Sequence, residues 1–363
     1  MRIVWFELLK LVKSPILIVL SLVMIALNLL VISEEWQDAY DTKPIFNEIA
    51  QDYGYEADRR FVSNIEASNE RLLEEMNQSF EEEYPSGSIA LESSTIQTDD
   101  SRMKEVVPLV IRESIIDTAI EADTYYSNLQ SKDIADHHIS HFGLESQAEA
   151  VQARYAPIDN RITEMVETNE HTTLFFRGYE IHSLLYREVI RNTLLGLSIV
   201  LVLLTAFSVN YEFDRNTALH TYSTKRGRKL LVNKWLAVNV ASLLFITAVL
   251  GATLLAFFLT TSFSGMWNSY VSSYFNMDGS LPYLTWWPIT MWQFLILAIG
   301  LTYLLLFIVV QLAFFTSVWV RNSYGVFFSY AYWCWFPFYV TRIGADHEPI
   351  YILCRIHTLH SHD

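Results

Sequence analysis

The sequence predicts an all-α, polytopic helical membrane protein with a mostly helical extracytoplasmic domain. Of the 363 residues, 52% are hydrophobic, and many gather in runs of about 20, the length that a helix needs to cross a bilayer. Residues 34–190 differ, with 33 acidic and 12 basic residues and apolar residues at helical spacing. Short basic segments flank the apolar runs, which is typical of loops that stay in the cytoplasm.

Residues 1–14 predict an amphipathic interface helix. The stretch RIVWFELLKLVK places its charged residues on one side and most of its apolar residues on the other, so it can lie in the inner interface with its bases toward anionic headgroups. Ser14-Pro15 should break this helix. Residues 15–33, PILIVLSLVMIALNLLVIS, are the first predicted span, and because no small-residue cleavage site follows we expect a retained anchor.

Residues 34–190 form the predicted extracytoplasmic domain. Three of its segments show helical periodicity: 44–82, 103–130 and 144–190. Pro157 should interrupt the third segment, whose end should run directly into the second span. Residues 84–101 carry Pro, Gly and Ser, which predicts a loop that could hold a pair of strands.

Residues 191–341 predict a transmembrane domain with four further spans: 193–210, 236–260, 290–316 and 323–341. The loop 261–289 is rich in tryptophan and tyrosine, which are expected at headgroup level. Asn28 and Gln311 lie within spans, where a bond to another helix is the common role of such residues. Five crossings from a cytoplasmic N-terminus place the short tail, residues 342–363, outside. This tail lacks the apolar length for a sixth crossing.

The second and third spans are separated by a polar loop, residues 211–234, with six Lys and Arg against two acids. This balance predicts a cytoplasmic loop. The stretch EFDRNTALHTYS can form a short helix with Glu212 and Asp214 near its positive N-terminal end. The basic cluster KRGRK that follows can hold the third span at anionic lipid or meet acidic residues of a partner protein. From the residues alone, a simple anchor and a partner-binding element fit equally well.

The order of these elements and the polar loop resemble ABC-2 type transporter permeases, in the subgroup with a large extracytoplasmic domain between the first and second spans. The loop of those permeases often reads roughly FSxExxxGTxxxLxxSPxSRxxxxxxK. The corresponding residues here are Phe207, Ser208, Glu212, Thr217, Leu219, Ser223, Arg226, Arg228 and Lys234. This chain departs from the pattern at Asn216 and Thr224, where Gly and Pro are usual.

The resemblance implies the permease subunit of an ATP-driven ABC exporter in the cell membrane, with a cytoplasmic N-terminus. A separate ABC ATP-binding subunit would hold ATP and Mg²⁺ and perform the hydrolysis, and a second permease chain, identical or different, would complete the path. The residues implied to couple to the ATPase are Glu212, Asp214, Arg215, Thr217, Arg226, Arg228 and Lys234. Lipid, peptide, antibiotic and glycan all fit as the exported substrate.

Several other classes fit the sequence poorly. The net charge of −15 argues against nucleic-acid binding, and the two cysteines lack the spacing of a disulfide framework or a zinc site. Because no GxxxxGK[ST], HExxH or GxSxG motif occurs, we predict no catalytic residue, metal or cofactor in this chain. His137 and His141 lie four residues apart on one expected helix face and could bind a metal, but a solvated helix with chance histidines is the commoner case.

The alternative function is a membrane-anchored sensor or extracellular ligand-binding module without transport activity. Such a module normally carries a cytoplasmic signalling domain, whereas the longest inner segment here is the loop 211–234. The acidic domain could also attract cationic peptides through its field, although a solvated acidic surface explains the same composition.

Overall fold

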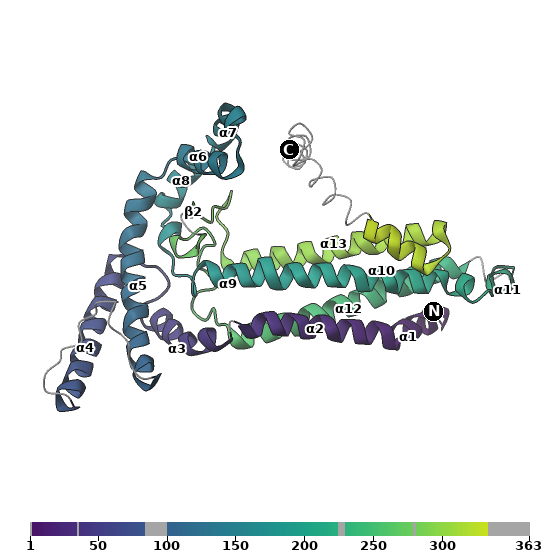
Figure 1. Ribbon diagram of the computed structural model, residues 1–363, viewed down its shortest axis with the longest axis horizontal. Coiled ribbons are helices and arrows are strands. Elements are labelled where there is room, and N and C mark those ends of the chain that lie inside the picture. The colour runs from purple at the N-terminus through teal and green to yellow at the C-terminus, as the bar shows by residue number, and fades with distance from the viewer. Residues whose placement is uncertain (1, 35, 84–99, 224–228, 279–280, 333–363) are drawn as a thin grey trace. The chain divides into compact units, whose positions relative to one another are not determined.

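The computed structural model describes residues 2–34, 36–83, 100–223, 229–278 and 281–332 (Figure 1). Helices dominate this part of the chain, which confirms the all-α class. The helices are α1 Arg2–Val12, α2 Pro15–Glu34, α3 Trp36–Asp52, α4 Arg59–Glu83, α5 Asp100–Asn128, α6 Ser131–Phe142, α7 Ala148–Tyr155, α8 Ile158–Glu167, α9 Tyr179–Ser183, α10 Arg191–Asp214, α11 Ala218–Tyr222, α12 Leu230–Thr260 and α13 Met291–Val320. Residues 323–332 are also helical. Two short antiparallel strands are described, β1 Met277–Asp278 and β2 Leu281–Pro282.

Four helices of the described part are long and apolar enough to cross a membrane: Pro15–Glu34, Tyr179–Asp214, Leu230–Thr260 and Met291–Val320. The second of these joins α9, a π-helical segment Leu184–Ile190 and α10 without interruption. The helix before the second span therefore does run directly into it. The predicted fifth span is described only as far as residue 332, and the tail 342–363 lies outside the described residues.

The contacts within the chain separate two compact units. The first, here called the span unit, comprises Met1–Leu30, Val189–Leu255 and Gly300–Asp363. The second, here called the acidic unit, comprises Val31–Glu188 and Ala256–Ile299. The long loop between α12 and α13 thus belongs with the acidic unit and not with the spans that it connects.

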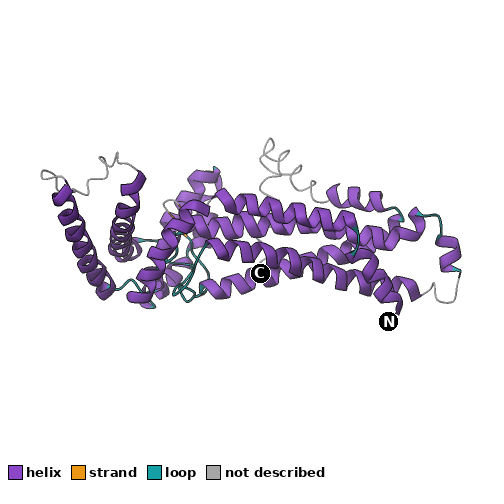
Figure 2. Cartoon of the chain, turned by 90° about the horizontal axis from the view of Figure 1, so that it is seen from below, coloured by secondary structure: helices purple, strands orange, loops and turns teal. Residues whose placement is uncertain are grey.

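In the span unit the long helices lie side by side (Figure 2). Their apolar core takes residues from α1, α2, α10, α12 and α13. The chain breaks between α1 and α2 at Ser14-Pro15, as expected, because proline has no N–H to continue the first helix. Gly196 lets α10 approach α2 closely, since a Cβ at this position would lie only 1.8 Å from the sulfur of Met24.

In the acidic unit α4 and α5 pack against each other (Figure 1). A smaller core joins α5, α6 and α8 through Tyr126, Ile134, Ile158, Ile162 and Met165. Pro157 ends the helical segment before α8, as predicted. The prediction of helix across 144–190 was wrong for residues 173–178, which are not helical; Thr173 instead pairs with Glu56 in an isolated antiparallel bridge. The proposed strand pair near residues 84–100 falls almost entirely outside the described residues.

Candidate functional site

The polar loop between the second and third spans begins where α10 ends. Asn216 has a left-handed backbone with φ 56°. Its N–H donates to the carbonyl of Phe213 at 3.1 Å, and the N–H of Thr217 donates to the carbonyl of Glu212 at 2.9 Å. These two bonds form a Schellman motif, in which a residue with positive φ satisfies the last carbonyls of a helix. A short helix, α11, then follows from Ala218.

The expectation of a single helix over EFDRNTALHTYS was therefore wrong. Glu212 and Asp214 lie in the last turn of α10, at the negative end of its dipole, and not at the positive start of a new helix. The reason is the backbone reversal at Asn216, a residue that tolerates positive φ better than most.

Glu212 finds its partner on the third span. The ammonium of Lys234 donates to the carboxylate of Glu212, and both side chains are buried. Lys234 also donates to the carbonyl of Ser208 at 2.6 Å and to that of Val209 at 3.3 Å. A cation placed at the C-terminal end of α10 offsets the negative helix end. The pair ties the end of α10 to the beginning of α12, with α11 between them in sequence.

Three other predicted coupling residues, Asp214, Arg215 and Thr217, lie near this pair in the described part of the chain. Asp214 accepts a hydrogen bond of 2.5 Å from the hydroxyl of Ser323. The guanidinium of Arg215 lies over the ring of Tyr211, 5.7 Å from its centre. The hydroxyl of Thr217 donates to the carbonyl of Glu212 at 3.4 Å.

Two predicted coupling residues, Arg226 and Arg228, lie outside the described residues. In the described part of the loop, the side chain of Leu219 on α11 is 88% exposed. A single exposed apolar side chain is common on protein surfaces, and Leu219 gains interest from its place on a short helix between two spans. The sequence pattern included Leu219, but only the structure shows its exposure.

The interface helix α1 also meets this end of the span unit. The ammonium of Lys10 lies 4.0 Å from the centre of the Tyr211 ring and 2.9 Å from the carboxylate of Glu7. Leu11 is buried in the shared core. Trp5 and Phe6, by contrast, are exposed. The helix is thus anchored on α10 by one side while other apolar residues remain outward, an arrangement that suits the membrane interface.

Asn28 and Gln311, the two polar residues noted within the spans, bond other helices, as expected. Asn28 donates to the hydroxyl of Thr193 at 2.7 Å and to that of Thr253 at 3.2 Å, and so joins α2 to both α10 and α12. Gln311 on α13 accepts a bond of 2.8 Å from the indole of Trp235 and donates to Asn239 at 2.7 Å. These bonds hold the bundle together away from water.

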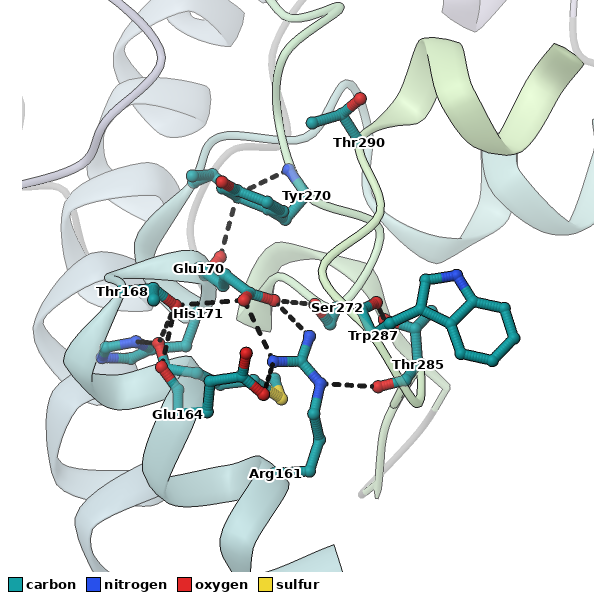
Figure 3. A network of polar contacts seen from close by, with 12 residues as sticks. Arg161, Glu164, Thr168, Glu170, His171, Tyr270, Ser272, Thr285, Trp287 and Thr290 are labelled. Carbon is teal, nitrogen blue, oxygen red and sulfur yellow. Dashed lines mark hydrogen bonds and ion pairs between the residues drawn. The ribbon is translucent and has the colours of Figure 1, made fainter. Parts of the chain in front are cut away.

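The acidic unit contains a buried polar network that the sequence did not indicate (Figure 3). Arg161 on α8 forms two hydrogen bonds with the fully buried carboxylate of Glu170, at 3.0 and 2.5 Å. Glu170 also accepts a bond of 3.0 Å from Ser272, while Arg161 donates to the carbonyl of Thr285 at 2.9 Å. Burial lowers the pKa of Arg161, but the bonds and charge of Glu170 outweigh this effect and the pKa is raised overall.

This network connects α8 to the loop between the third and fourth spans. Ser273 in that loop donates to the carbonyl of Thr173, and Tyr126 on α5 donates to the carbonyl of Ser272 at 3.1 Å. Burial raises the pKa of Tyr126. Tyr274 packs against both Tyr125 and Tyr126. Tyr274 is partly buried and packs against the core of the acidic unit.

The candidate histidine pair lies on α6, where the rings of His137 and His141 stack with centres 6.1 Å apart. Within the described ranges, no group of three or more His, Cys, Asp or Glu side chains is arranged to hold a metal ion. Comparison of this chain with models of known protein families, with curated proteins and with solved structures finds no match.

Proposed function

We propose that this chain is the permease subunit of an ATP-driven exporter of the ABC-2 type, and that a separate ATP-binding subunit docks on the loop around α11. The proposal places that loop and the N-terminus in the cytoplasm, and the acidic unit outside. The chain itself performs no hydrolysis. The observation that carries the proposal is a short helix, α11, between two spans that the buried Glu212–Lys234 pair joins, with Leu219 as its exposed apolar side chain.

Transport of this kind requires that a movement of the ATPase reach the spans. A loop that flexed freely would absorb the movement. Here the Schellman motif fixes the exit of the chain from α10, and the ion pair fixes the entry into α12. A force applied at Leu219 would therefore reach the end of α10, and the ion pair would pass it to the beginning of α12. Because Glu212 and Lys234 are buried, their role in the proposal is to hold the loop and not to touch the partner.

The left-handed backbone of Asn216 also supports the family resemblance. The related permeases usually carry Gly at this position, and this chain departs from them. Both residues are suited to positive φ: Gly has no Cβ to clash, and Asn is the most common substitute at the end of a helix. Asn216 therefore keeps a positive φ that glycine at this position would also adopt easily.

Purification from native membranes in a mild detergent tests the proposal. The wild-type protein should co-purify with a subunit that is labelled by an azido-ATP probe and that hydrolyses ATP in a vanadate-sensitive manner. Leu219→Asp should remove most of this activity from the purified sample, because a carboxylate would have to be buried at the interface. Leu219→Met is the matched control, since it keeps an apolar side chain of similar size.

Two results would contradict the proposal. One is a wild-type sample without any associated ATP-binding subunit. The other is equal ATP hydrolysis in samples of wild-type protein and Leu219→Asp, with equal amounts of the chain in the membrane.

A further inference from the structure

The acidic unit contains a groove of about 560 Å³ that the polar network does not occupy. Helix α5 supplies one wall through residues at helical spacing, including Val110, Ser114, Thr118 and Glu121. Phe46, Phe175, Tyr274 and Phe275 supply aromatic surface on the other sides. The volume falls within the range of about 300–1,000 Å³ that is usual for small-molecule sites, and such sites combine apolar walls with few polar groups.

An unusual backbone turn brings Arg177 to the lining of this groove. Arg177 has φ 49° and is followed by Gly178 with φ 63°. A Cβ at Gly178 would lie 2.5 Å from the carbonyl oxygen of Phe275, so only glycine fits there. A non-glycine residue with positive φ costs free energy and persists only where its surroundings enforce it. The buried rings of Phe175 and Phe176 immediately before the turn provide that support.

The two charges of the groove lie on different elements. The side chain of Arg177 is only 16% exposed, and it bonds at 3.2 Å to Glu180, whose side chain is 71% exposed. Because the Glu180 end of this pair faces solvent, a ligand carboxylate can compete with Glu180 for the guanidinium. On the opposite element, Glu121 accepts a long bond of 3.4 Å from the hydroxyl of Tyr274. A carboxylate has capacity for further donors.

We propose that this groove binds a short apolar peptide with free termini, with its ammonium group at Glu121 and its carboxylate at Arg177. The apolar side chains would lie against the aromatic walls, and the hydroxyl of Ser114 would face the peptide groups, while that of Thr118 donates to the carbonyl of Ser114 at 2.6 Å. Residues 34–190 carry a formal net charge of −21. The negative potential of this charge attracts the ammonium group and disfavours a purely anionic ligand. This proposal does not rest on the transport function, because binding requires no ATPase.

Calorimetry with the full-length protein in lipid nanodiscs tests the proposal, with trileucine as the probe. Wild-type protein should bind trileucine, and N-acetylation or C-terminal amidation of the peptide should each weaken binding about tenfold or more, since each removes one charge-assisted contact. Glu121→Gln should weaken binding of the free peptide by a similar factor and should abolish the effect of N-acetylation. Arg177→Asn should do the same for amidation, and Asn tolerates the positive φ of this position.

A steric variant provides an independent measurement. Val110 lines the groove and is 46% exposed, so Val110→Trp should fill the groove and abolish binding. Ile120→Trp is the matched control, because Ile120 is on the same helix, similarly exposed and not part of the groove. The proposal is overturned if wild-type protein does not bind trileucine, if Val110→Trp binds it as well as Ile120→Trp, or if the amidated peptide binds as tightly as the free one. The last result would indicate attraction by the acidic field alone.

Discussion

The ammonium of Lys234, near the start of α12, and the carboxylate of Glu212, in the last turn of α10, form a buried ion pair. The two residues are 22 positions apart in the sequence. Their bond closes the loop that contains α11, and it leaves neither charge available to solvent.

The first prediction concerns the removal of one partner. Glu212→Gln or Lys234→Met should each destabilise the protein by about 3–5 kcal/mol, because an unpaired charge would remain buried. The double variant Glu212→Met with Lys234→Met should recover much of this loss, since no charge is left behind. Thermal unfolding in detergent measures the effect. Lys229→Met, at an exposed position of the same loop, is the control and should change the midpoint little.

A different charge pair holds the acidic unit. Glu170→Gln should destabilise the contact between α8 and the loop at Ser272 and Thr285, because Arg161 would lose its buried carboxylate partner and keep only the half-exposed Glu164, at 3.2 Å. Hydrogen exchange should rise in residues 269–278 and 281–285 first. Glu167→Gln, at an exposed position at the end of α8, should leave the exchange pattern unchanged. Equal exchange in the two variants would show that the network does not hold the loop.

The backbone at Asn216 leads to a third prediction. Asn216→Gly should preserve or slightly raise stability, because glycine adopts φ 56° without strain. Asn216→Val should lower stability by about 1–2 kcal/mol, since a β-branched side chain clashes in this conformation. The midpoint of thermal unfolding distinguishes the two. A similar loss for Gly and Val would mean that the Asn side chain matters and the backbone angle does not.

The orientation of the chain gives the fourth prediction. In a variant that lacks Cys334 and Cys354, a cysteine at Ser127 should react with an impermeant thiol reagent on intact cells. A cysteine at Ser223 should react only after the cells are opened. Both positions are exposed on their own units, so access to the reagent depends on the side of the membrane. The reverse labelling pattern would exclude the cytoplasmic placement of α11 and with it the proposed function.

The sequence was sufficient for features that depend on short stretches of chain. Hydropathy predicted the four apolar helices of the described part, because a bilayer core accepts about 20 consecutive apolar residues and few others. Pro15 and Pro157 fixed two breaks, since proline lacks the N–H that a helix needs. The bonding roles of Asn28 and Gln311 were also predicted, because a polar side chain within a span must find a partner inside the protein.

Only the tertiary structure decided which distant residues meet. Sequence reasoning placed Glu212 at the start of a short helix. In the structure the backbone reversal at Asn216 ends α10 instead, and Glu212 lies in its last turn. There its carboxylate forms an ion pair with Lys234. Nor did the sequence indicate that Tyr274, in the loop 261–289, packs beside Tyr126 of α5. Periodicity and hydropathy describe one segment at a time. The partner of a buried charge or ring depends instead on where another part of the chain returns, and that is set by packing of the whole unit.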